Sequence, residues 1–229
     1  MSTLLLRLAA PLQSWGYESK FERRATGREP TKSGVIGLLA AALGRRRDEP
    51  LEDLAQLKFG VRVEKEGQVM MDFHTAKAES RKDSYVTRRY YLEDAAFLVG
   101  LEGDAAFLQT LEAAVNSPFF PLFLGRRSCP PTGQVCLGIR DAALKEALRD
   151  EPFPAGTKSE PFRLLLDTNE VGAYRQRDLP ISFSQQHRKF AYRYIKTCTD
   201  MVGGKTEQIE AEGNAHATEH DAFEGVAEK

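Results

Sequence analysis

The hydrophobic positions at the start of the chain form a strand-like run followed by a helix-like run. Residues 4–8 are apolar apart from one arginine, which predicts a buried first strand. Residues 34–43 are also apolar, and they follow Thr31 and Ser33 and end before Gly44. This pattern predicts a helix that is capped by one of the two hydroxyl side chains and ends at the glycine.

The next hydrophobic positions alternate with polar ones, as they do in strands. A short helix is expected over 51–57, and the patterns of 59–63 and 69–73 predict two strands joined as a hairpin. The polar and charged stretch 76–87 predicts an excursion that interrupts the sheet. Strand character resumes over 89–101.

A second long helix is expected after this strand. Asp104 can cap it, its apolar residues share one face, and Pro118 lies just beyond its end. A last strand is then expected to lead into the loop Leu122–Pro131. The order from residue 4 to residue 124 is therefore strand, helix, strand, strand, helix, strand, which is the order of a ferredoxin-like unit in a mixed α+β fold. Sheets of this kind often bind RNA.

The second half of the chain predicts a smaller, β-rich part. A helix is expected over 142–149, and strands are expected over 162–166, 181–183 and 190–195. We therefore divide the chain into a ferredoxin-like domain (1–135), a small β-rich domain (136–202) and an acidic tail (203–229). The tail lacks apolar periodicity, so we expect it to be disordered.

The overall composition is that of an ordinary globular protein. The 229 residues are 41% hydrophobic and 28% charged, and no apolar run approaches the roughly 20 residues of a membrane helix. The N-terminal apolar stretch is short for a signal peptide, so we expect a cytoplasmic protein that does not associate with membranes. The three cysteines lack zinc-site spacing and no nucleotide-binding fingerprint appears, so we expect no disulfide, metal or cofactor.

The net charge of −1 hides an uneven distribution of charge. The tail holds seven acidic against two basic residues, so it carries −5 and the remainder carries +4. The positive charge is clustered at Arg23-Arg24, Arg45–Arg47, Arg88-Arg89, Arg126-Arg127 and Arg188-Lys189. Such clusters favour a polyanionic partner, although some, above all the one at the end of the predicted first helix, are explained equally well as solvated surface.

The loop Leu122–Pro131 has the composition of a phosphate-binding loop. Gly125 permits close approach of a backbone, the forked side chains of Arg126 and Arg127 match phosphate oxygens, and Ser128 precedes a stiff double proline. The alternative is an ordinary solvated turn whose arginines form surface salt bridges.

Three further positions could carry chemistry. Trp15, beside Gln13, could stack on a base or anchor the core. Tyr90 and Tyr91 follow Arg88-Arg89, a combination that suits single-stranded RNA but also fits a strand with one tyrosine inside. His74 could act as a general base that cleaves RNA, and it could equally be a structural histidine.

Several segments together resemble the CasD family, whose members are subunits of the type I-E CRISPR surveillance complex, Cascade. This family belongs to the RAMP superfamily. These segments are Leu6–Gly16, Pro30–Leu39, Asp72–Thr75 and Leu124–Pro130. They keep their order across about the first 135 residues, and their combination is specific.

The resemblance implies a ferredoxin-like RAMP domain with a small C-terminal β domain and no catalytic activity. A family member holds the 5′ handle of the guide RNA (crRNA), caps the filament of CasC backbone subunits and helps to seat the large subunit, CasA. A family member is then expected to contact target DNA only indirectly, through the other parts of the complex. By position, residues 77–89 correspond to the thumb-like excursion of the family, although they make a short one.

Together, the residues and the resemblance suggest a set of RNA-binding candidates. Arg89, Arg126, Arg127 and Lys32 are expected to neutralise phosphates, and backbone amides near Ser33 and Gly125 are expected to donate further hydrogen bonds. The complete set is Gln13, Trp15, Lys32, Ser33, Arg88, Arg89, Gly125, Arg126, Arg127 and Ser128.

Two alternatives remain open at this point. In a related subtype the equivalent protein cuts the repeat RNA without a metal ion, and here His74 would be the candidate base. The chain could also be a generic binder of single-stranded RNA that works alone. In the interpretation we favour, no residue is catalytic.

Overall fold

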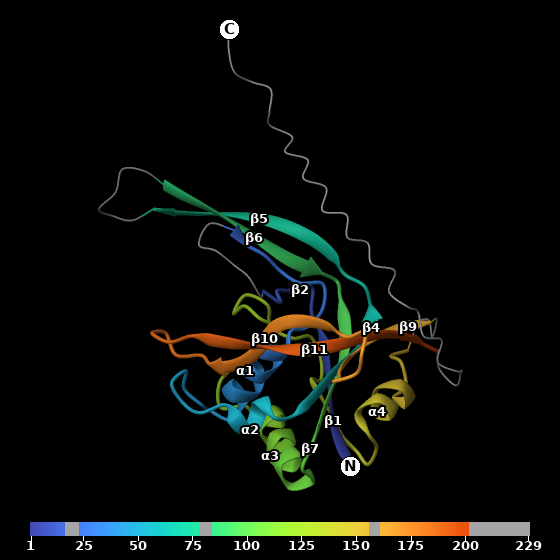
Figure 1. The fold of residues 1–229 in the computed structure, drawn as a ribbon. Helices are drawn as coiled ribbons and strands as arrows, with labels where there is room; N and C mark the ends of the chain where they lie inside the picture. Colours follow the sequence, from blue (N-terminus) through green and yellow to red (C-terminus); the bar gives the residue numbers. More distant parts are fainter. Residues whose placement is uncertain (17–22, 78–83, 156–160, 202–229) are drawn as a thin grey trace.

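The computed structural model describes residues 1–16, 23–77, 84–155 and 161–201, and its main feature is a seven-stranded sheet (Figure 1). The strand order of this sheet is β10-β11-β9-β4-β7-β1-β8. A smaller, four-stranded sheet is built around β6 and lies above the large one in the view of Figure 1. The predicted acidic tail (203–229) lies outside the described residues.

β1 (Ser2–Ala9) is the predicted first strand, and it lies inside the large sheet. It pairs antiparallel with β7 (Ala96–Gly103) on one side and with β8 (Cys136–Arg140) on the other. Leu4, Leu6 and Leu8 belong to one hydrophobic cluster and Leu5 belongs to another. Both faces of the strand are therefore covered, which explains why its sequence is a continuous apolar run rather than an alternating one.

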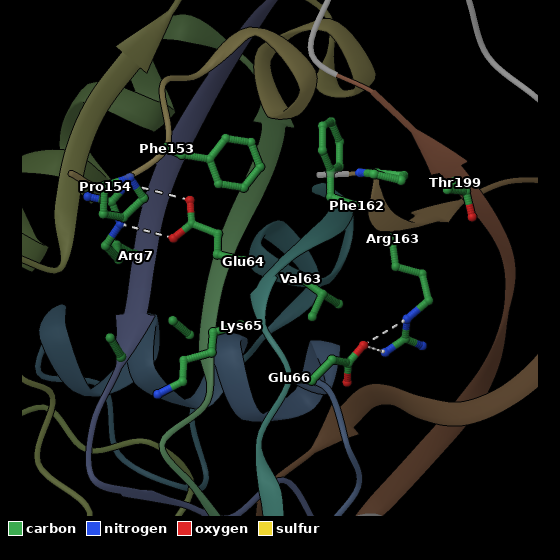
Figure 2. A pocket seen from close by; sticks show the side chains of 13 residues that line it. Arg7, Val63, Glu64, Lys65, Glu66, Phe153, Pro154, Phe162, Arg163 and Thr199 are labelled. Atoms are coloured by element: carbon green, nitrogen blue, oxygen red, sulfur yellow. Dashed lines mark hydrogen bonds and ion pairs between the residues drawn. The ribbon is translucent and has the colours of Figure 1, made fainter. Parts of the chain in front are cut away.

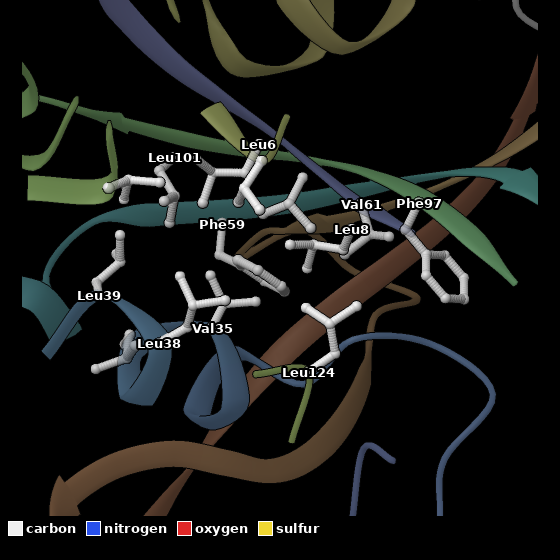
Figure 3. Close-up of a cluster of buried hydrophobic side chains, with 14 of the residues drawn as sticks. Leu6, Leu8, Val35, Leu38, Leu39, Phe59, Val61, Phe97, Leu101 and Leu124 are labelled. Atoms are coloured by element: carbon white, nitrogen blue, oxygen red, sulfur yellow. The ribbon is translucent and has the colours of Figure 1, made fainter. Parts of the chain in front are cut away.

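Three helices cover one face of the large sheet. They are α1 (Lys32–Ala42), α2 (Glu52–Ala55) and α3 (Ala105–Asn116), and their leucines and valines belong to the larger cluster. Figure 3 shows Val35, Leu38 and Leu39 of α1 facing the strands. Thr31 is the cap of α1, because its side chain accepts a hydrogen bond from the Gly34 amide. Asp104 caps α3 by accepting from the Phe107 amide, so the caps predicted from sequence are confirmed.

The opposite face is covered by α4 (Leu144–Asp150), whose Leu144, Ala147 and Leu148 pack against Leu5 and Leu98. When the short elements β2, β3 and α2 and the β5–β6 hairpin are set aside, the order is β1, α1, β4, β7, α3, β8. This is the predicted alternation of strands and helices, but its last strand, β8, lies beyond the predicted first domain. The mixed α+β class is confirmed. Among the described helices, none is long and apolar enough to cross a membrane.

The predicted hairpin between 59–63 and 69–73 is wrong. β4 (Lys58–Lys65) pairs with β7 and with β9 (Phe162–Asp167), so both of its edges are occupied by other strands. β5 (Gln68–Lys77) instead pairs along its whole length with β6 (Ser84–Glu93) in the smaller sheet. The β5–β6 hairpin is therefore an insertion between two strands of the large sheet, and residues 78–83 of the predicted thumb 77–89 lie outside the described ranges.

Two other strand predictions also need correction. The strand expected over 89–101 is two strands, because β6 ends at Glu93 and β7 begins at Ala96, with Asp94 between them at a φ of 53°. The strand expected at 122–124 is absent from the irregular stretch 117–135, all of which is described. This stretch contains four prolines, which donate no backbone hydrogen bond, and the last strand of the unit, β8, follows the loop rather than preceding it.

The strands after residue 135 extend the large sheet. β9 lies beside β4, β11 (Lys189–Asp200) lies beside β9, and β10 (Tyr174–Ser182) forms the edge. The division predicted at residue 136 therefore does not coincide with a boundary between sheets. The smaller sheet contains β6 at its centre, with β5 on one edge and the short strands β2 (Leu12–Gln13) and β3 (Arg23–Arg24) on the other.

Candidate nucleic-acid interface

The loop that the sequence singled out is a tight turn anchored in the core. The Leu124 amide donates to the Cys129 carbonyl (2.7 Å), and the Cys129 amide donates to the Arg126 carbonyl (2.9 Å). The side chains of Leu124 and Cys129 are buried. These two anchors hold Arg126, Arg127 and Ser128 at the tip of the turn, with Arg127 and Ser128 exposed.

Gly125 is required for a contact inside the protein. Its φ is +84°, and a Cβ atom at this position would lie 1.7 Å from the carbonyl oxygen of Ser14. The Ser14 amide also donates to the Leu124 carbonyl (3.1 Å). The backbone that approaches Gly125 is therefore that of Ser14. This contact explains why a glycine is needed here, whereas the sequence had suggested the approach of a phosphate.

Arg126 reaches from the turn to the smaller sheet. Its Nη2 donates to the carbonyl oxygen of Arg24 (2.8 Å), and its guanidinium lies 4.6 Å from the centre of the Tyr91 ring. Because Arg24 belongs to β3 and Tyr91 to β6, this side chain ties the turn to two strands. Its other Nη atom, Nη1, is buried and has no partner among the described residues.

The hydroxyl group of Tyr91 is the point where the turn meets β6. Burial alone would raise the pKa of Tyr91, but hydrogen bonds with Ser128, Arg126 and Arg89, and the charge of Arg126, hold it below its usual value. Arg89 lies two residues before Tyr91 on the same face of β6, and its Nε is also buried without a partner in the described part of the chain. The turn and the predicted thumb residue Arg89 are thus brought together.

β3 and β6 bring two pairs of arginines into register. The strands pair in parallel, with Arg23 opposite Arg88 and Arg24 opposite Arg89. Arg23 also lies over the Tyr90 ring, 5.0 Å from its centre. We call the following set the arginine cluster: Arg23, Arg24, Arg88, Arg89, Arg126 and Arg127. The sequence marked these pairs as basic, but it gave no sign that β3, formed by two residues, lies beside β6.

The arginine cluster has no acidic partners among the described residues. None of the ion pairs within the described residues includes a member of it. Because side chains alternate along β6, Arg23 and Arg88 lie on the face of Tyr90, whereas Arg89 and Arg126 lie on the face of Tyr91. Each face therefore presents positive charge that an anion would neutralise. The forked donors and the neighbouring tyrosines suit phosphates and bases of single-stranded RNA.

Gln13 and Trp15 are buried inside the protein. Gln13 donates from Nε2 to the Ala95 carbonyl (2.8 Å), and its Oε1 accepts from the indole Nε1 of Trp15 (2.9 Å). Trp15 is 1% exposed and packs against Gly34 at the start of α1. These contacts favour the role of a core anchor over the predicted contact with RNA, since neither side chain has surface to offer.

Lys32 and Ser33 also have partners within the chain. The Lys32 ammonium pairs with Asp167 (3.0 Å), and its backbone amide donates to Asp178 (2.9 Å). The Ser33 hydroxyl is half-buried and donates to the Thr31 side chain (3.4 Å). The predicted phosphate contact of Lys32 conflicts with this buried pair. Its two carboxylates come from strands far along the chain, so the sequence contained no signal for them.

His74 lies on β5 and has a carboxylate neighbour. Its Nε2 is 2.6 Å from the Asp72 carboxylate, and both side chains are partly exposed. Asp72 faces Arg89 in the register of the hairpin. In the described ranges there is no group of three or more metal-ligating side chains.

A pocket of about 850 Å³ lies elsewhere on the large sheet, between β4 and the segment before β9 (Figure 2). Its lining includes Arg7 and Arg163, but Arg7 pairs with Glu64 (3.3 Å) and Arg163 pairs with Glu66 (2.8 Å). Because these cations are neutralised from within the protein, the pocket is a weaker candidate for a polyanion than the arginine cluster is.

Comparisons with known proteins agree with the sequence resemblance. Residues 3–196 match the family described as CRISPR-associated protein (Cas_Cas5). The chain is 37% identical over 182 residues to the CRISPR system Cascade subunit CasD of Escherichia coli K12, and the match covers 69% of this chain and 81% of that protein.

Two solved structures share the fold. One, described as a crystal structure of a Cas protein, is 43% identical with a TM-score of 0.73, and the match covers 88% of this chain and 96% of the other. The second is a chain of a CRISPR RNA-guided surveillance complex, 33% identical with a TM-score of 0.74, with 87% and 90% of the two chains covered.

Proposed function

The chain belongs to the Cas5 family of CRISPR-associated proteins, and from this premise we propose that it is a non-catalytic, RNA-binding subunit of a type I-E CRISPR surveillance complex. In this role the arginine cluster holds the 5′ handle of the crRNA. The observation that carries the proposal is that Arg89 and Arg126 meet at Tyr91 and that neither has an acidic partner among the described residues. The similarity to a Cascade subunit and to a chain of an RNA-guided surveillance complex supports the same class of function.

Phosphate contacts supply most of the affinity in this proposal. Arg89 and Arg126 are only half-buried and form no ion pair with a described carboxylate, so their accessible guanidinium donors can bind phosphate oxygens. Arg127 and Arg88 are exposed and contribute further positive charge. Edge contacts from Ser128, which lies beside Arg126 at the tip of the turn, then fix which nucleotides lie at the site.

The subunit also occupies a defined place in the complex. We propose that it caps the filament of CasC backbone subunits and helps to seat the large subunit, CasA, so that target DNA is met through the assembly. The support for these partners is the similarity to CasD of Escherichia coli.

The test of this function changes Arg126 and Arg127 together to alanine. Guide RNA is expected to leave the co-expressed complex at lower salt than in the unchanged protein. For binding to single-stranded RNA, the slope of log affinity against log salt falls by about 0.7 for each phosphate that the protein no longer neutralises. The control is Arg46→Ala with Arg47→Ala, which removes the same charge from an exposed site after α1.

An unchanged slope and full retention of the guide in the Arg126→Ala, Arg127→Ala variant would reject the turn as a phosphate site. Equal reductions of retention in the variant and in the control would mean that net charge, rather than the arginine cluster, determines how firmly the guide is held.

The endoribonuclease alternative depends on His74. The nearby Asp72 carboxylate could orient the imidazole as a base. Labelled repeat RNA incubated with the purified protein in a chelator is expected to stay intact. A defined cut that His74→Ala abolishes would support the enzyme in place of the binding subunit.

A further inference from the structure

A second basic and aromatic surface lies on the ribbon formed by β10 and β11. On its outer face, Arg175 lies opposite Tyr194 in the register of the two strands, and the Arg175 guanidinium is 4.1 Å from the centre of the Tyr192 ring. Arg177 approaches the same ring at 6.0 Å. We call these four residues, Arg175, Arg177, Tyr192 and Tyr194, the ribbon surface. Arg188 lies just before β11, with its guanidinium 5.2 Å from the centre of the Phe190 ring.

The ribbon surface is exposed because α4, which covers this face of the sheet further along β11, does not extend to it. Tyr192 is 49% exposed and Tyr194 is 50% exposed, whereas Cys198, further along the same face of β11, is covered by the cluster around α4. The tyrosines therefore lie beyond the reach of α4. Large aromatic side chains left in the open on a rigid strand favour a binding role over a packing role.

The inner face of the ribbon is fixed by buried ion pairs. Arg193 donates from Nε to Asp178 (2.6 Å) and also pairs with Asp167. Asp178 accepts the backbone amide of Lys32 at the start of α1. These bonds hold the ribbon rigidly on the body of the protein, so the outer side chains keep their spacing without a partner.

The cations of the ribbon surface have no acidic partners. No ion pair among the described residues includes Arg175, Arg177, Arg188 or Lys189. On the inner face, by contrast, Arg193 is paired twice. An arginine that stacks on a tyrosine and keeps its donors free can bind a phosphate while the ring next to it accepts a base.

The position of the ribbon connects it with the arginine cluster. Asp178 of the ribbon accepts a hydrogen bond at the start of α1, and this end of the helix packs against Trp15. Ser14, which precedes Trp15, is hydrogen-bonded to Leu124 at the base of the turn. The two surfaces therefore belong to one rigid body. In Figure 1 the β5–β6 hairpin and the turn of the β10–β11 ribbon both extend to the left of the view.

We propose that the ribbon surface is a second contact site for the guide RNA, in which Tyr192 and Tyr194 stack on unpaired bases and Arg175 and Arg177 bind the phosphates between them. This inference rests on the proposed function, since it assumes that the chain carries a guide. The contact is made by stacking and charge, so it tolerates different bases.

The test uses the complete, co-expressed complex with 4-thiouridine in the guide RNA. After irradiation, crosslinked peptides are expected from β11, including Tyr192 and Tyr194, and from the turn that contains Arg126. Crosslinks at the turn without crosslinks at β11 would overturn this inference and leave the proposed function standing. Crosslinks at neither site would overturn both. Crosslinks at β11 alone would support the ribbon and reject the turn.

Variants separate stacking from charge in the full chain, with a fluorescent 20-nucleotide oligouridine as the probe. Tyr192→Ala with Tyr194→Ala is expected to weaken binding about fivefold or more, whereas Tyr192→Phe with Tyr194→Phe keeps the affinity, because the rings remain. Equal affinity of the alanine and phenylalanine variants would contradict stacking.

Arg175→Ala with Arg177→Ala is expected to lower the salt slope by about 1.4, and Arg46→Ala with Arg47→Ala is expected to leave it unchanged. If the Arg175→Ala, Arg177→Ala variant keeps its affinity for RNA but loses another subunit from the complex, the occupant of the ribbon surface is an acidic protein and the inference is overturned. Thermal unfolding checks that each variant is folded.

Discussion

At the scale of single residues, the cations of this chain separate according to their partners. Lys32, Arg62 and Arg193 are buried and each pairs with a carboxylate, so removing one would leave an uncompensated charge inside the protein. Arg89 and Arg126 lack such partners among the described residues. The first group stabilises the fold, and the second is available to a ligand.

This separation explains which candidate residues the sequence could identify. Arg126 and Arg127 were predicted correctly to lie on a turn, because glycine and proline signals are local. Lys32 and Trp15 have the same local appearance as binding residues. However, Lys32 contacts its partners Asp167 and Asp178, and Trp15 packs against Gly34, only in the folded chain. Long-range pairing of this kind leaves no pattern in one sequence.

Glu102 gives the stability of the protein a dependence on pH. It pairs with Lys58 (2.6 Å) and accepts the amide of Leu144 at the start of α4, which has no side-chain cap of its own. Burial alone would raise the pKa of Glu102, but these bonds hold it below its usual value of 4.5. The unfolded chain therefore takes up the proton first, so this contribution is present above about pH 4.5 and is lost as the pH falls through the folded pKa.

Glu102→Gln is accordingly expected to lower the free energy of unfolding by about 1–2 kcal/mol at pH 7. In urea unfolding followed from pH 7 to pH 3, the difference between the two proteins should shrink below pH 4.5. A difference that stays constant over this range would contradict the role given to the Glu102 carboxylate.

A substitution at Gly125 tests how closely the turn packs on the backbone of Ser14. Gly125→Ala would place a Cβ atom 1.7 Å from the Ser14 carbonyl oxygen at a φ of +84°, so we expect a decrease of about 3 kcal/mol in the free energy of unfolding. Gly133→Ala is the matched control, because Gly133 has a φ of +73° but nothing within 4 Å. Its decrease should be about 1 kcal/mol. Equal decreases in urea unfolding would show that backbone strain alone acts at Gly125.

At the scale of elements, the smaller sheet shows why local patterns misled the assignment of strand pairs. Alternation correctly indicated strands at β4 and β5, but a hairpin also needs a free edge on each strand. Both edges of β4 are taken by β7 and β9, and β9 comes some hundred residues later. Helix caps were predictable because Thr31 and Asp104 act within three residues.

The β5–β6 hairpin is expected to serve binding more than stability. Replacing residues 74–87 by a two-residue turn keeps Arg88, Arg89 and Tyr91 and leaves every strand of the large sheet intact. The temperature of unfolding should therefore change little, while guide retention in the complex falls because most of the hairpin that corresponds to the thumb of the family has been removed. Failure to fold in calorimetry, or full retention of the guide, would contradict this division of roles.

At the scale of the whole molecule, charge and architecture agree. The body carries +4 although the chain carries −1. Most of the described arginines without an ion pair lie at the smaller sheet and on the ribbon, whereas Arg46 and Arg47 lie apart from them after α1. The large sheet provides the rigid body that holds both regions. The predicted class of fold followed from the strand and helix order, whereas the joining of the C-terminal strands to the same sheet depends on pairing across the chain and could not be predicted.

The most direct measurement is a footprint of the guide RNA in the assembled complex, with this chain present either unchanged or as Arg89→Ala with Arg126→Ala. The unchanged chain should protect the 5′ handle from hydroxyl radicals, and the variant should expose the handle while the rest of the guide stays protected. If the handle is equally protected with the variant, the arginine cluster does not hold the guide and the central claim is wrong.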